Sequence, residues 1–515
     1  MNYPVWYIPA VGGPLIIALV AIVHVVVSHF AVGGGLWLVV TEKKAYKEKK
    51  EFILDYVKKH TLFFMLLTMV FGAITGVGIW FTIALINPDA TSALIHFFVF
   101  GWAIEWVFFL IEIVTAFLYF YTFKKISKKT HLLIGWVYFI AAWASLFVIN
   151  GIISFMMTPG KWLETQNFWD GFFNPSFWPS LVFRTFLCFA LAGSYALLTA
   201  AKKFKGDERK TLVKYNGKWI LYSLLGMIPS LIWYYFTIPG LAQEGLAGAS
   251  NIMEMSLMYL IIGLVVFLLL LFLFILWKSE KLNFTWSIIV LLAIFVFFGA
   301  FEFLREAGRK PYAISQYMYA TGVKVSQQEE LKGKPVLQQA KWVQTREVNE
   351  TNELTAGEEL FRIQCYSCHS FGIKNNISSK ITRWDLKKTI RTIGTLKGIT
   401  AFMPGFVGSD GEKIALGKWL YSITHEGVEI PPTGVEAPAG LPAGKTVFEE
   451  YCTDCHEPGG DNPIEPKLEK FKSVDEITDI LGKLETLNED MPPFEGTAEE
   501  KKTLAQYLYK LRSEK

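Results

Sequence analysis

The sequence predicts an all-α protein in which a polytopic bundle of eight membrane-spanning helices is followed by two small helical domains. Of its 515 residues, 52% are hydrophobic and 16% are aromatic, and the apolar residues gather before about residue 308. Eight apolar stretches in that region are each long enough to cross the hydrocarbon layer of a membrane, which is roughly 30 Å thick. The rest of the chain is polar and repeats its own pattern. The expected spans are residues 14–40, 60–86, 93–123, 131–157, 177–201, 217–240, 253–277 and 283–305.

Lysine is distributed unevenly between the links that join these spans. The first link, residues 42–60, holds seven lysines and the fifth, residues 202–218, is strongly basic, whereas the second and sixth contain no lysine or arginine. Cytoplasmic loops of membrane proteins are enriched in these residues. We therefore expect a multi-pass protein of the bacterial inner (cytoplasmic) membrane whose N-terminus and whole C-terminal part lie on the periplasmic side. The first apolar stretch is too long for a cleavable signal peptide and is interpreted as a permanent span.

Two copies of a Cys-x-x-Cys-His motif occupy the polar part of the chain. The two thiols of such a motif lie about one helical turn apart, and each can form a thioether bond with a vinyl group of a haem. The histidine that follows, His369 or His456, then lies beneath the iron as its proximal ligand. Zinc and redox motifs use a similar spacing, but a duplicated motif with matching flanks favours two covalent haem c groups. The motif cysteines are Cys365, Cys368, Cys452 and Cys455, whereas Cys188 is expected in the apolar core.

The two motifs belong to a sequence repeat. Ala356-Gly357 precedes the first motif as Ala443-Gly444 precedes the second, and Met403-Pro404 matches Met491-Pro492. Each copy resembles a small class I cytochrome c, with a helix, a haem motif, a methionine loop and a closing helix. The resemblance implies that Met403 and Met491 are the sixth ligands of two electron-carrying haems, and the alternative is that they fill gaps in the core. The predicted domains are a membrane haem-binding domain (1–312), a linker (313–352), cytochrome c domain 1 (353–428), a Pro/Gly-rich linker (429–440) and cytochrome c domain 2 (441–515).

Ionisable residues are rare inside the expected spans, where burial is costly and a charge usually has a function. Glu105 and Glu112 lie two helical turns apart on one face of the third span, and Arg309 follows the eighth. The alternative interpretation is that such residues make interhelical polar contacts. His60, His96 and His131 lie at span ends and are expected at the membrane interface. The candidates inside the spans are His24, His29, Glu105, Glu112, Arg184, Glu302 and Glu306.

The membrane part resembles subunit I of the cytochrome bd oxidases over about residues 10–315. The order and placement of several short motifs carry this resemblance. They are Ala-Ile-Val-His24, Gly-Ala-Ile-Thr-Gly at 72–76, Ala-Ile-Glu105 with Ile-Glu112, Ile-Asn-Gly at 149–151, Thr-Pro-Gly at 158–160, and Glu306-Ala-Gly-Arg309-Lys-Pro-Tyr312.

The resemblance implies that His24 and Glu306 are axial ligands of two non-covalent haems, of b or d type, at an oxygen-reducing centre. It places Glu105 beside that centre and gives Glu112 a part in bringing protons from the cytoplasm. Arg309, which follows Glu306 in the last motif, is a further candidate for haem contact. Members of this family usually work with a second membrane subunit, so a partner chain is expected.

The chain departs from the family in two places. Arg184 stands where the family has a histidine ligand of its low-spin haem, so that haem is either missing or held differently. Arg184 is expected to pair with a haem propionate or with Glu306, because a charge near the bilayer needs a partner. The long hydrophilic quinol-binding loop between the sixth and seventh spans is also absent, and only residues 239–251 replace it.

These features predict a membrane terminal oxidase. Electrons from an external c-type cytochrome would pass through two c-haems to the membrane haems, where O2 is reduced to water. One alternative is an electron-transfer module that links a membrane partner to outer cytochromes without reducing O2. Another is a membrane anchor for a dihaem carrier. The net charge of +4 is small for this length and gives no indication of nucleic acid binding.

Overall fold

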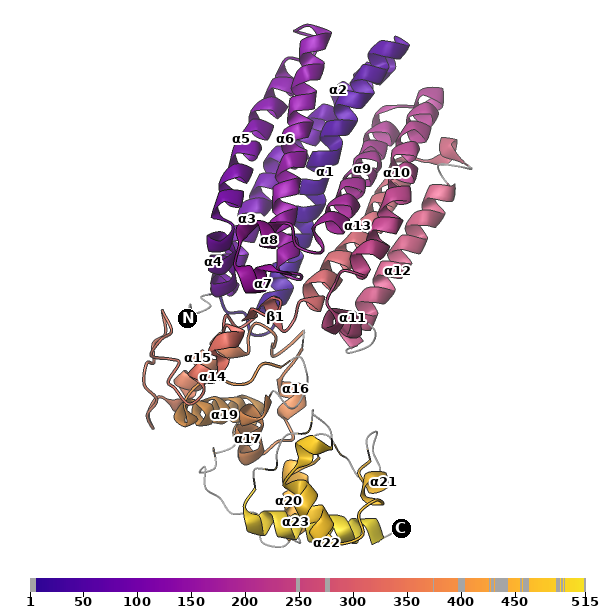
Figure 1. Cartoon of the computed structure of the whole chain (residues 1–515). Coiled ribbons are helices and arrows are strands. Elements are labelled where there is room, and N and C mark those ends of the chain that lie inside the picture. Colours follow the sequence, from indigo (N-terminus) through magenta and orange to yellow (C-terminus); the bar gives the residue numbers. More distant parts are fainter. Residues whose placement is uncertain are drawn as a thin grey trace. The chain divides into compact units, whose positions relative to one another are not determined.

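The computed structural model describes residues 6–246, 251–273, 278–373, 375–396, 403–425, 443–453, 463–487 and 496–513, together with residues 427, 430, 456, 491 and 494. It is almost entirely helical, as the sequence predicts (Figure 1). The chain divides into two compact units, Asn2–Val325 and Ser326–Lys515. The division falls inside the segment 313–352 that was expected to link the membrane part to the cytochrome part.

The first unit is a bundle of long helices that carries most of the apolar residues of the chain. Three short helices lie outside the main bundle: α7 (Trp162–Thr165), α8 (Phe168–Phe172) and α11 (Gly240–Leu246). A π-helical stretch, η1 (Leu66–Gly72), interrupts the second long helix, and a 3-10 turn, η3 (Ser279–Lys281), precedes the last. The other helices are α1 (Gly13–Glu48), α2 (Glu51–Met65), α3 (Ala73–Ile86), α4 (Pro88–Phe97), α5 (Val99–Tyr121), α6 (Lys128–Phe155), α9 (Phe177–Lys203), α10 (Gly206–Tyr235), α12 (Asn251–Leu271) and α13 (Phe284–Gly308).

Six helical segments among the described residues are long and apolar enough to cross a membrane, so this unit is a multi-pass membrane domain. They are α1, the continuous segment Glu51–Ile86, α5, α6, α9 and α13. The expected sixth and seventh spans coincide with α10 and α12, which do not meet the same criterion. Helix α10 is less apolar, with Pro229 and several serine and tyrosine residues in its second half, and the apolar part of α12 that is described is only Leu257–Leu271. The expected number of eight spans is therefore not reproduced.

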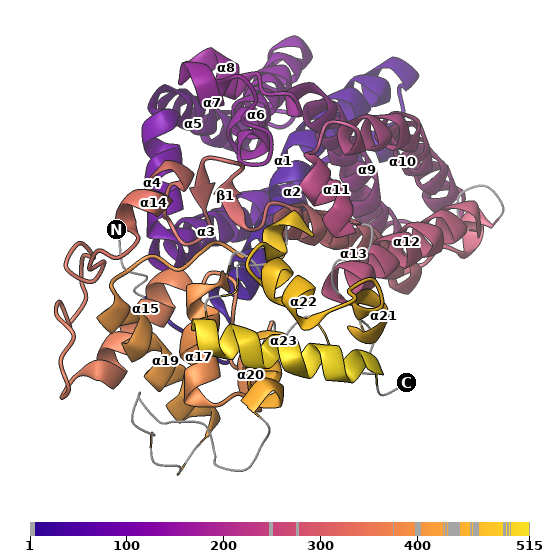
Figure 2. The ribbon, with the colours of Figure 1, turned by 60° about the horizontal axis from the view of Figure 1, so that its bottom comes forward.

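Helices α1, α9 and α13 pack against one another, and α9 lies between α1 and α10 (Figures 1 and 2). The contact between α1 and α9 is unusually close at Gly33, where an added Cβ would lie 1.9 Å from the carbonyl oxygen of Cys188. Cys188 is fully buried, as expected of a residue in the apolar core. This close approach allows side chains on the three helices to reach one another.

The segment after α13 folds onto the membrane unit instead of leaving it. Strands β1 (Tyr312–Ile314) and β2 (Met318–Tyr319) pair in an antiparallel arrangement, and Ser315 N–H donates to the Met156 carbonyl oxygen at 2.8 Å. Tyr317 packs its ring against Phe97 and Trp162. Residues 312–325 are therefore part of the first unit.

The second unit contains two similar groups of helices. The first comprises α14 (Gln328–Leu331), α15 (Glu353–Gln364), α16 (Ser378–Ile381), α17 (Leu386–Gly394) and α19 (Asp410–Thr424), preceded by a short 3-10 turn, η4 (Val325–Gln327). The second comprises α20 (Ala443–Tyr451), α21 (Glu465–Leu468), α22 (Val474–Leu481), the 3-10 turn η5 (Leu484–Thr486) and α23 (Ala498–Ser513).

Two buried glutamates attach the segment before α15 to the first group of helices. The carboxylate of Glu412 accepts the backbone N–H groups of Val336 at 3.0 Å and Leu337 at 2.8 Å. That of Glu359 accepts those of Gln344 at 2.6 Å and Thr345 at 2.9 Å. Most of the segment expected as a linker thus belongs to one folded unit or the other.

The two copies of the sequence repeat also share a packing feature, a close contact between their first and last helices. In the first copy, a Cβ on Gly357 of α15 would lie 2.3 Å from the Ala415 carbonyl oxygen of α19. In the second copy, a Cβ on Gly444 of α20 would lie 2.2 Å from the Thr503 carbonyl oxygen of α23. Only glycine permits these crossings, in which the first helix of each copy touches the backbone of the closing helix.

Replacing Gly357 with Ala is expected to destabilise the first cytochrome group by about 1–3 kcal/mol, because the added methyl group forces the two helices apart. Thermal unfolding followed by the absorbance of the c-haem should detect the change. Gly411→Ala is a suitable control, since a Cβ there would meet only the Ser409 hydroxyl oxygen at 4.0 Å. Equal stability of the two variants would contradict the close-crossing interpretation.

Candidate functional site

The first Cys-x-x-Cys-His motif forms a single tight turn at the end of α15. The backbone N–H groups of Cys368 and His369 both donate to the Cys365 carbonyl oxygen, at 3.0 and 2.9 Å. This turn places the two thiols and the imidazole on one short segment, and both thiols are free. Burial raises the pKa of the Cys365 thiol to about 12, and His369 is also buried. A buried, apolar turn with two free thiols and one histidine fits a covalently attached haem.

The loop that carries Met403 is tied to this turn. Gln364, which precedes Cys365, donates from Nε2 to the Val407 carbonyl oxygen at 2.6 Å and accepts the Val407 N–H at 3.0 Å. Met403 is half-buried at the start of the same loop. The hydrogen bonds therefore hold the methionine loop against the motif, which is the arrangement that a sixth ligand requires.

The second motif has the same local geometry where it is described. The His456 N–H donates to the Cys452 carbonyl oxygen at 2.8 Å, whereas Cys455 lies outside the described residues. Tyr451, which precedes Cys452, packs on Phe494 with ring centroids 4.8 Å apart. Phe494 lies in the loop that begins with Met491, so the second methionine loop is also anchored beside its motif.

In the membrane unit, the hydrogen bonds around His24 determine its tautomer, and hence which ring nitrogen has a lone pair for binding a metal. His24 Nδ1 lies 3.1 Å from Thr75 Oγ1, and that hydroxyl has carbonyl oxygens of its own turn, Phe71 at 2.9 Å and Gly72 at 3.0 Å, as acceptors. Because the hydroxyl hydrogen is used there, its oxygen accepts from His24, so Nδ1 carries the hydrogen and Nε2 keeps its lone pair. A neutral imidazole with a free Nε2, oriented by a hydrogen bond at Nδ1, is the form that binds iron.

The backbone around Thr75 makes room for this ring. The π-helical stretch η1 ends at Gly72, and such stretches are often found at functional sites. A Cβ on Gly76 would lie 3.1 Å from His24 Cε1, so glycine lets α3 approach the imidazole closely. The Gly-Ala-Ile-Thr-Gly motif thus supplies both the hydrogen-bond partner and the space for His24.

Replacing Thr75 with Val is expected to weaken haem retention at His24 about 10- to 100-fold, the usual effect of removing a hydrogen bond to a metal-binding histidine. Haem loss during detergent washing, followed spectroscopically, would measure it. Thr82→Val is a matched control on the same helix, because the Thr82 hydroxyl bonds only to the Gly78 carbonyl oxygen. Equal haem loss from the two variants would argue against the role of Thr75.

The structure brings Glu105 and Glu112 together through one serine. Ser145 of α6 donates its hydroxyl to Glu105 Oε1 at 2.9 Å and also lies beside Glu112. Glu112 is buried, and buried Tyr138 interacts with it electrostatically. The two carboxyl groups and the hydroxyl between them can therefore pass a proton along α5.

A second polar cluster, which the sequence did not indicate, lies at the other end of α5. The carboxylate of Glu42 accepts hydrogen bonds from Tyr46 O–H at 2.8 Å and Tyr119 O–H at 2.6 Å, and His131 Nδ1 lies 2.8 Å from Oε1. His131 Nε2 donates to the Tyr119 carbonyl oxygen at 2.8 Å. Only 2% of the His131 side chain is exposed. We expected His60 and His131 at the membrane interface; both lie near helix ends, and their side chains are buried against neighbouring helices.

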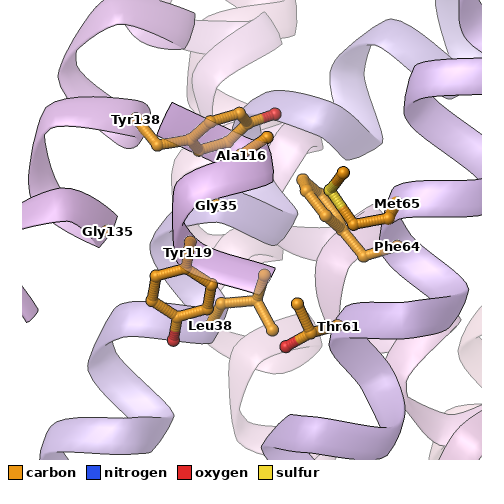
Figure 3. A pocket seen from close by; sticks show the side chains of 9 residues that line it. All are labelled: Gly35, Leu38, Thr61, Phe64, Met65, Ala116, Tyr119, Gly135 and Tyr138. Carbon is orange, nitrogen blue, oxygen red and sulfur yellow. The ribbon is translucent and has the colours of Figure 1, made fainter. Parts of the chain in front are cut away.

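A small cavity lies beside this cluster. Figure 3 shows Tyr138 on one side of it and Tyr119 with Thr61 on the other, and Phe64 and Met65 close it. Tyr119 follows Glu112 by seven residues, as Glu112 follows Glu105, so the three side chains share one face of α5. This spacing was visible in the sequence and could have identified Tyr119. The cavity therefore lies between the Glu42 cluster and the neighbours of Glu112.

Within the protein, Arg184 pairs with Glu302 and not with Glu306, one of the two partners expected. Its Nη2 lies 2.8 Å from Glu302 Oε1, and the Arg184 side chain is 1% exposed. Its Nη1 donates to His29 Nε2 at 3.2 Å, and its Nε donates to Ser180 Oγ at 3.3 Å. Glu306 pairs instead with Arg309, and the other expected partner, a haem propionate, stays a prediction. Glu302 and Glu306 lie one turn apart on α13, and the packing of α13 against α9 directs the first of them towards Arg184.

Glu306 therefore lies next to a guanidinium group that can hold it as a carboxylate. Arg309 itself is fixed by Nη1, which donates to the Ala313 carbonyl oxygen at 3.2 Å and lies 3.2 Å from Met156 Sδ. A charged carboxylate supported in this way is suited to axial ligation of a haem iron. Within the described residues, no group of three or more His, Cys, Asp or Glu side chains could hold a bare metal ion.

Comparisons with known proteins agree with this geometry. Residues 15–233 match the family of cytochrome bd terminal oxidase subunit I, and residues 352–420 and 439–508 match that of cytochrome c oxidase, cbb3-type, subunit III. The chain joins a bd oxidase-like membrane domain to cytochrome c domains. The structure of bd oxidase from Geobacillus thermodenitrificans covers 61% of this chain and 91% of its own, with a TM-score of 0.53 at 14% identity. No curated protein matches the chain.

This combination supports an oxidoreductase role in electron transport. The cytochrome c domains point to covalent haem c, and the bd oxidase-like domain points to haem b or d. The family match in the membrane domain ends before α13. The match therefore does not extend to Glu306.

Proposed function

We propose that this protein is the haem-bearing subunit of a membrane terminal oxidase that takes electrons from an external c-type cytochrome and reduces O2 to water. A haem with an open axial position supplies the chemistry that binds and reduces a diatomic gas. His24 and Glu306 are the proposed axial ligands in the membrane domain. His369 with Met403, and His456 with Met491, are the proposed ligands of the two covalent haems.

One observation carries the proposal: in a bd oxidase-like domain fused to cytochrome c domains, the hydrogen bond to Thr75 leaves Nε2 of His24 free to bind iron. The fused domains offer a route for electrons from a soluble or membrane-bound cytochrome. The short segment that replaces a long quinol-binding loop gives no comparable route from a quinol.

In this proposal the membrane domain also delivers protons. Ser145 lies between Glu112 and Glu105 and can form a hydrogen bond with the carboxyl group of each, so the three side chains make a continuous chain of polar groups. Glu112 accepts a proton from the side of Tyr119 and passes it towards Glu105. The distribution of lysine supports an orientation with the Tyr119 end of α5 on the cytoplasmic side and the cytochrome c domains on the periplasmic side. We further propose a second membrane subunit as a partner.

A carbon monoxide difference spectrum of the reduced, purified protein, taken beside a haem extraction, tests the proposal. Haems with a histidine and a methionine ligand should not react with the gas, so a signal should come only from a non-covalent haem. If non-covalent haem is present without a signal, the protein is an electron-transfer module and no oxidase. If only covalent haem is present, the membrane domain is an anchor.

A further inference from the structure

We propose that Arg305 binds the carboxylate of a haem propionate, at a largely buried site that carries an excess of positive charge. The site is a cluster of charged and polar side chains from three helices. Its members are His29 of α1, Arg184 of α9, and Glu302, Arg305, Glu306 and Arg309 of α13. The inference rests on the proposed function, since it takes a non-covalent haem to be bound near Glu306.

Two Glu–Arg pairs follow each other on the last turns of α13. Arg305 Nε donates to Glu302 Oε2 at 2.9 Å, and Arg309 pairs with Glu306 one turn further on. The first pair is joined to α9 by Arg184, whose Nη2 lies 2.8 Å from the other oxygen of Glu302. Each pair is spaced i, i+3, so the helix itself holds its members together.

The charges in this cluster do not balance. Three guanidinium groups face two carboxylates, and Lys310 also acts on Glu306, which leaves at least one positive charge if His29 is neutral. The hydrogen bonds show that it is: His29 Nδ1 donates to the Val25 carbonyl oxygen at 2.8 Å, and Nε2 accepts from Arg184. A histidine that accepts at one nitrogen and donates at the other carries no charge.

The cluster is largely shielded from solvent, and Arg305, to which the excess charge is assigned, is only partly exposed. The side chains of Arg184 and Glu302 are 1% and 6% exposed, and those of Arg305 and Arg309 are 15% and 10% exposed. An uncompensated charge in such surroundings is costly, and proteins compensate it with an ion of opposite sign. The cluster is therefore completed by an anion.

Arg305 is the member that remains available to this anion. Among the described residues, its only hydrogen-bonding partner is Glu302, through Nε, so its two terminal nitrogens are uncommitted. Arg184 uses all three of its nitrogens within the protein. Arg309 uses both of its terminal nitrogens.

The two terminal nitrogens of the Arg305 guanidinium group favour a carboxylate as the anion. Two neighbouring N–H groups in one plane match the two oxygens of a carboxylate, which they bind more strongly than a neutral acceptor. A haem bound in the membrane brings two propionate carboxylates with it. Arg305 directly precedes the proposed ligand Glu306 in the chain, so a haem held by Glu306 would bring a propionate within the neighbourhood of this side chain.

Redox titration of the non-covalent haems in the full-length protein tests the inference. In Arg305→Gln, the midpoint potential of one non-covalent haem should fall, because loss of a nearby positive charge favours the ferric state. Its release during detergent washing should also be faster, while both c-haems stay unchanged. Arg305→Lys should give a smaller fall, since the charge remains but the planar fork is lost. Glu302 keeps Arg184 as a partner in both variants, so the fold is preserved.

Arg209→Gln is the matched control, because Arg209 lies in the same unit at the beginning of α10 and donates to the Glu280 carbonyl oxygen. An unchanged potential and haem release in Arg305→Gln would overturn the inference. So would a phospholipid that is lost from Arg305→Gln while the haem is unaffected, since the anion would then be a lipid phosphate. A wild-type protein without non-covalent haem would instead refute the proposed function itself.

Discussion

Glu306→Gln should remove one non-covalent haem from the membrane domain and leave both covalent haems attached. A neutral amide is a poor ligand for iron, and it also loses the charged contact with Arg309. Removing a residue that only supports a metal ligand typically lowers affinity 10- to 100-fold, so loss of the ligand itself should exceed that. Extraction of haem followed by separate quantification of the covalent and non-covalent fractions measures the result.

Glu164→Gln is the appropriate control for this variant, because Glu164 is an exposed glutamate of the short helix α7 in the same unit. It should retain the full complement of haem. If Glu306→Gln also retained it, the assignment of Glu306 as a ligand would be wrong, and its pairing with Arg309 would be only structural. The covalent haems serve as an internal standard in both proteins.

Glu302→Leu should strongly destabilise the membrane domain. Glu302 is the carboxylate shared by Arg184 and Arg305, which lie at 2.8 and 2.9 Å from its two oxygens. Its removal leaves the buried Arg184 guanidinium group without an anionic partner, and breaking a buried ion pair in this way costs about 3–5 kcal/mol. Thermal unfolding in detergent, followed by loss of the monodisperse protein in size-exclusion chromatography, would show a large fall in the unfolding temperature.

The double variant Arg184→Leu/Glu302→Leu separates a charge effect from a packing effect. It removes the more deeply buried guanidinium group together with the carboxylate, so it should recover much of the stability lost in Glu302→Leu. If the double variant is less stable than the single one, the cost comes from lost packing and the ion pair is unimportant.

The covalent haem sites were predictable from the sequence because they depend on local spacing. The Cys-x-x-Cys-His turn is closed by hydrogen bonds within five residues, and the methionine loops are anchored to the residue before each motif. The ligand roles of Met403 and Met491 remain predictions, as do those of His24 and Glu306. The helical character of both parts followed from apolar length and repetition.

The polar contacts between helices were not predictable in the same way. Glu302 and Glu306 are both one turn from the end of an apolar stretch, and only the rotation of α13 against α9 decides which of them meets Arg184. His131 lies near the end of α6, yet Glu42 on α1 draws it into the bundle. Such choices depend on how helices far apart in sequence pack together, and one sequence does not reveal that packing.

The folding of residues 312–325 onto the membrane domain changes how the two parts of the chain are connected. With Val336, Leu337, Gln344 and Thr345 held by the cytochrome unit, only the short stretch 326–335 lies between the two attachments. A short tether keeps its two ends at an effective concentration on the order of millimolar. Under the proposed function, electron delivery within the chain would then be first order and insensitive to dilution, and only the encounter with the external donor would depend on concentration.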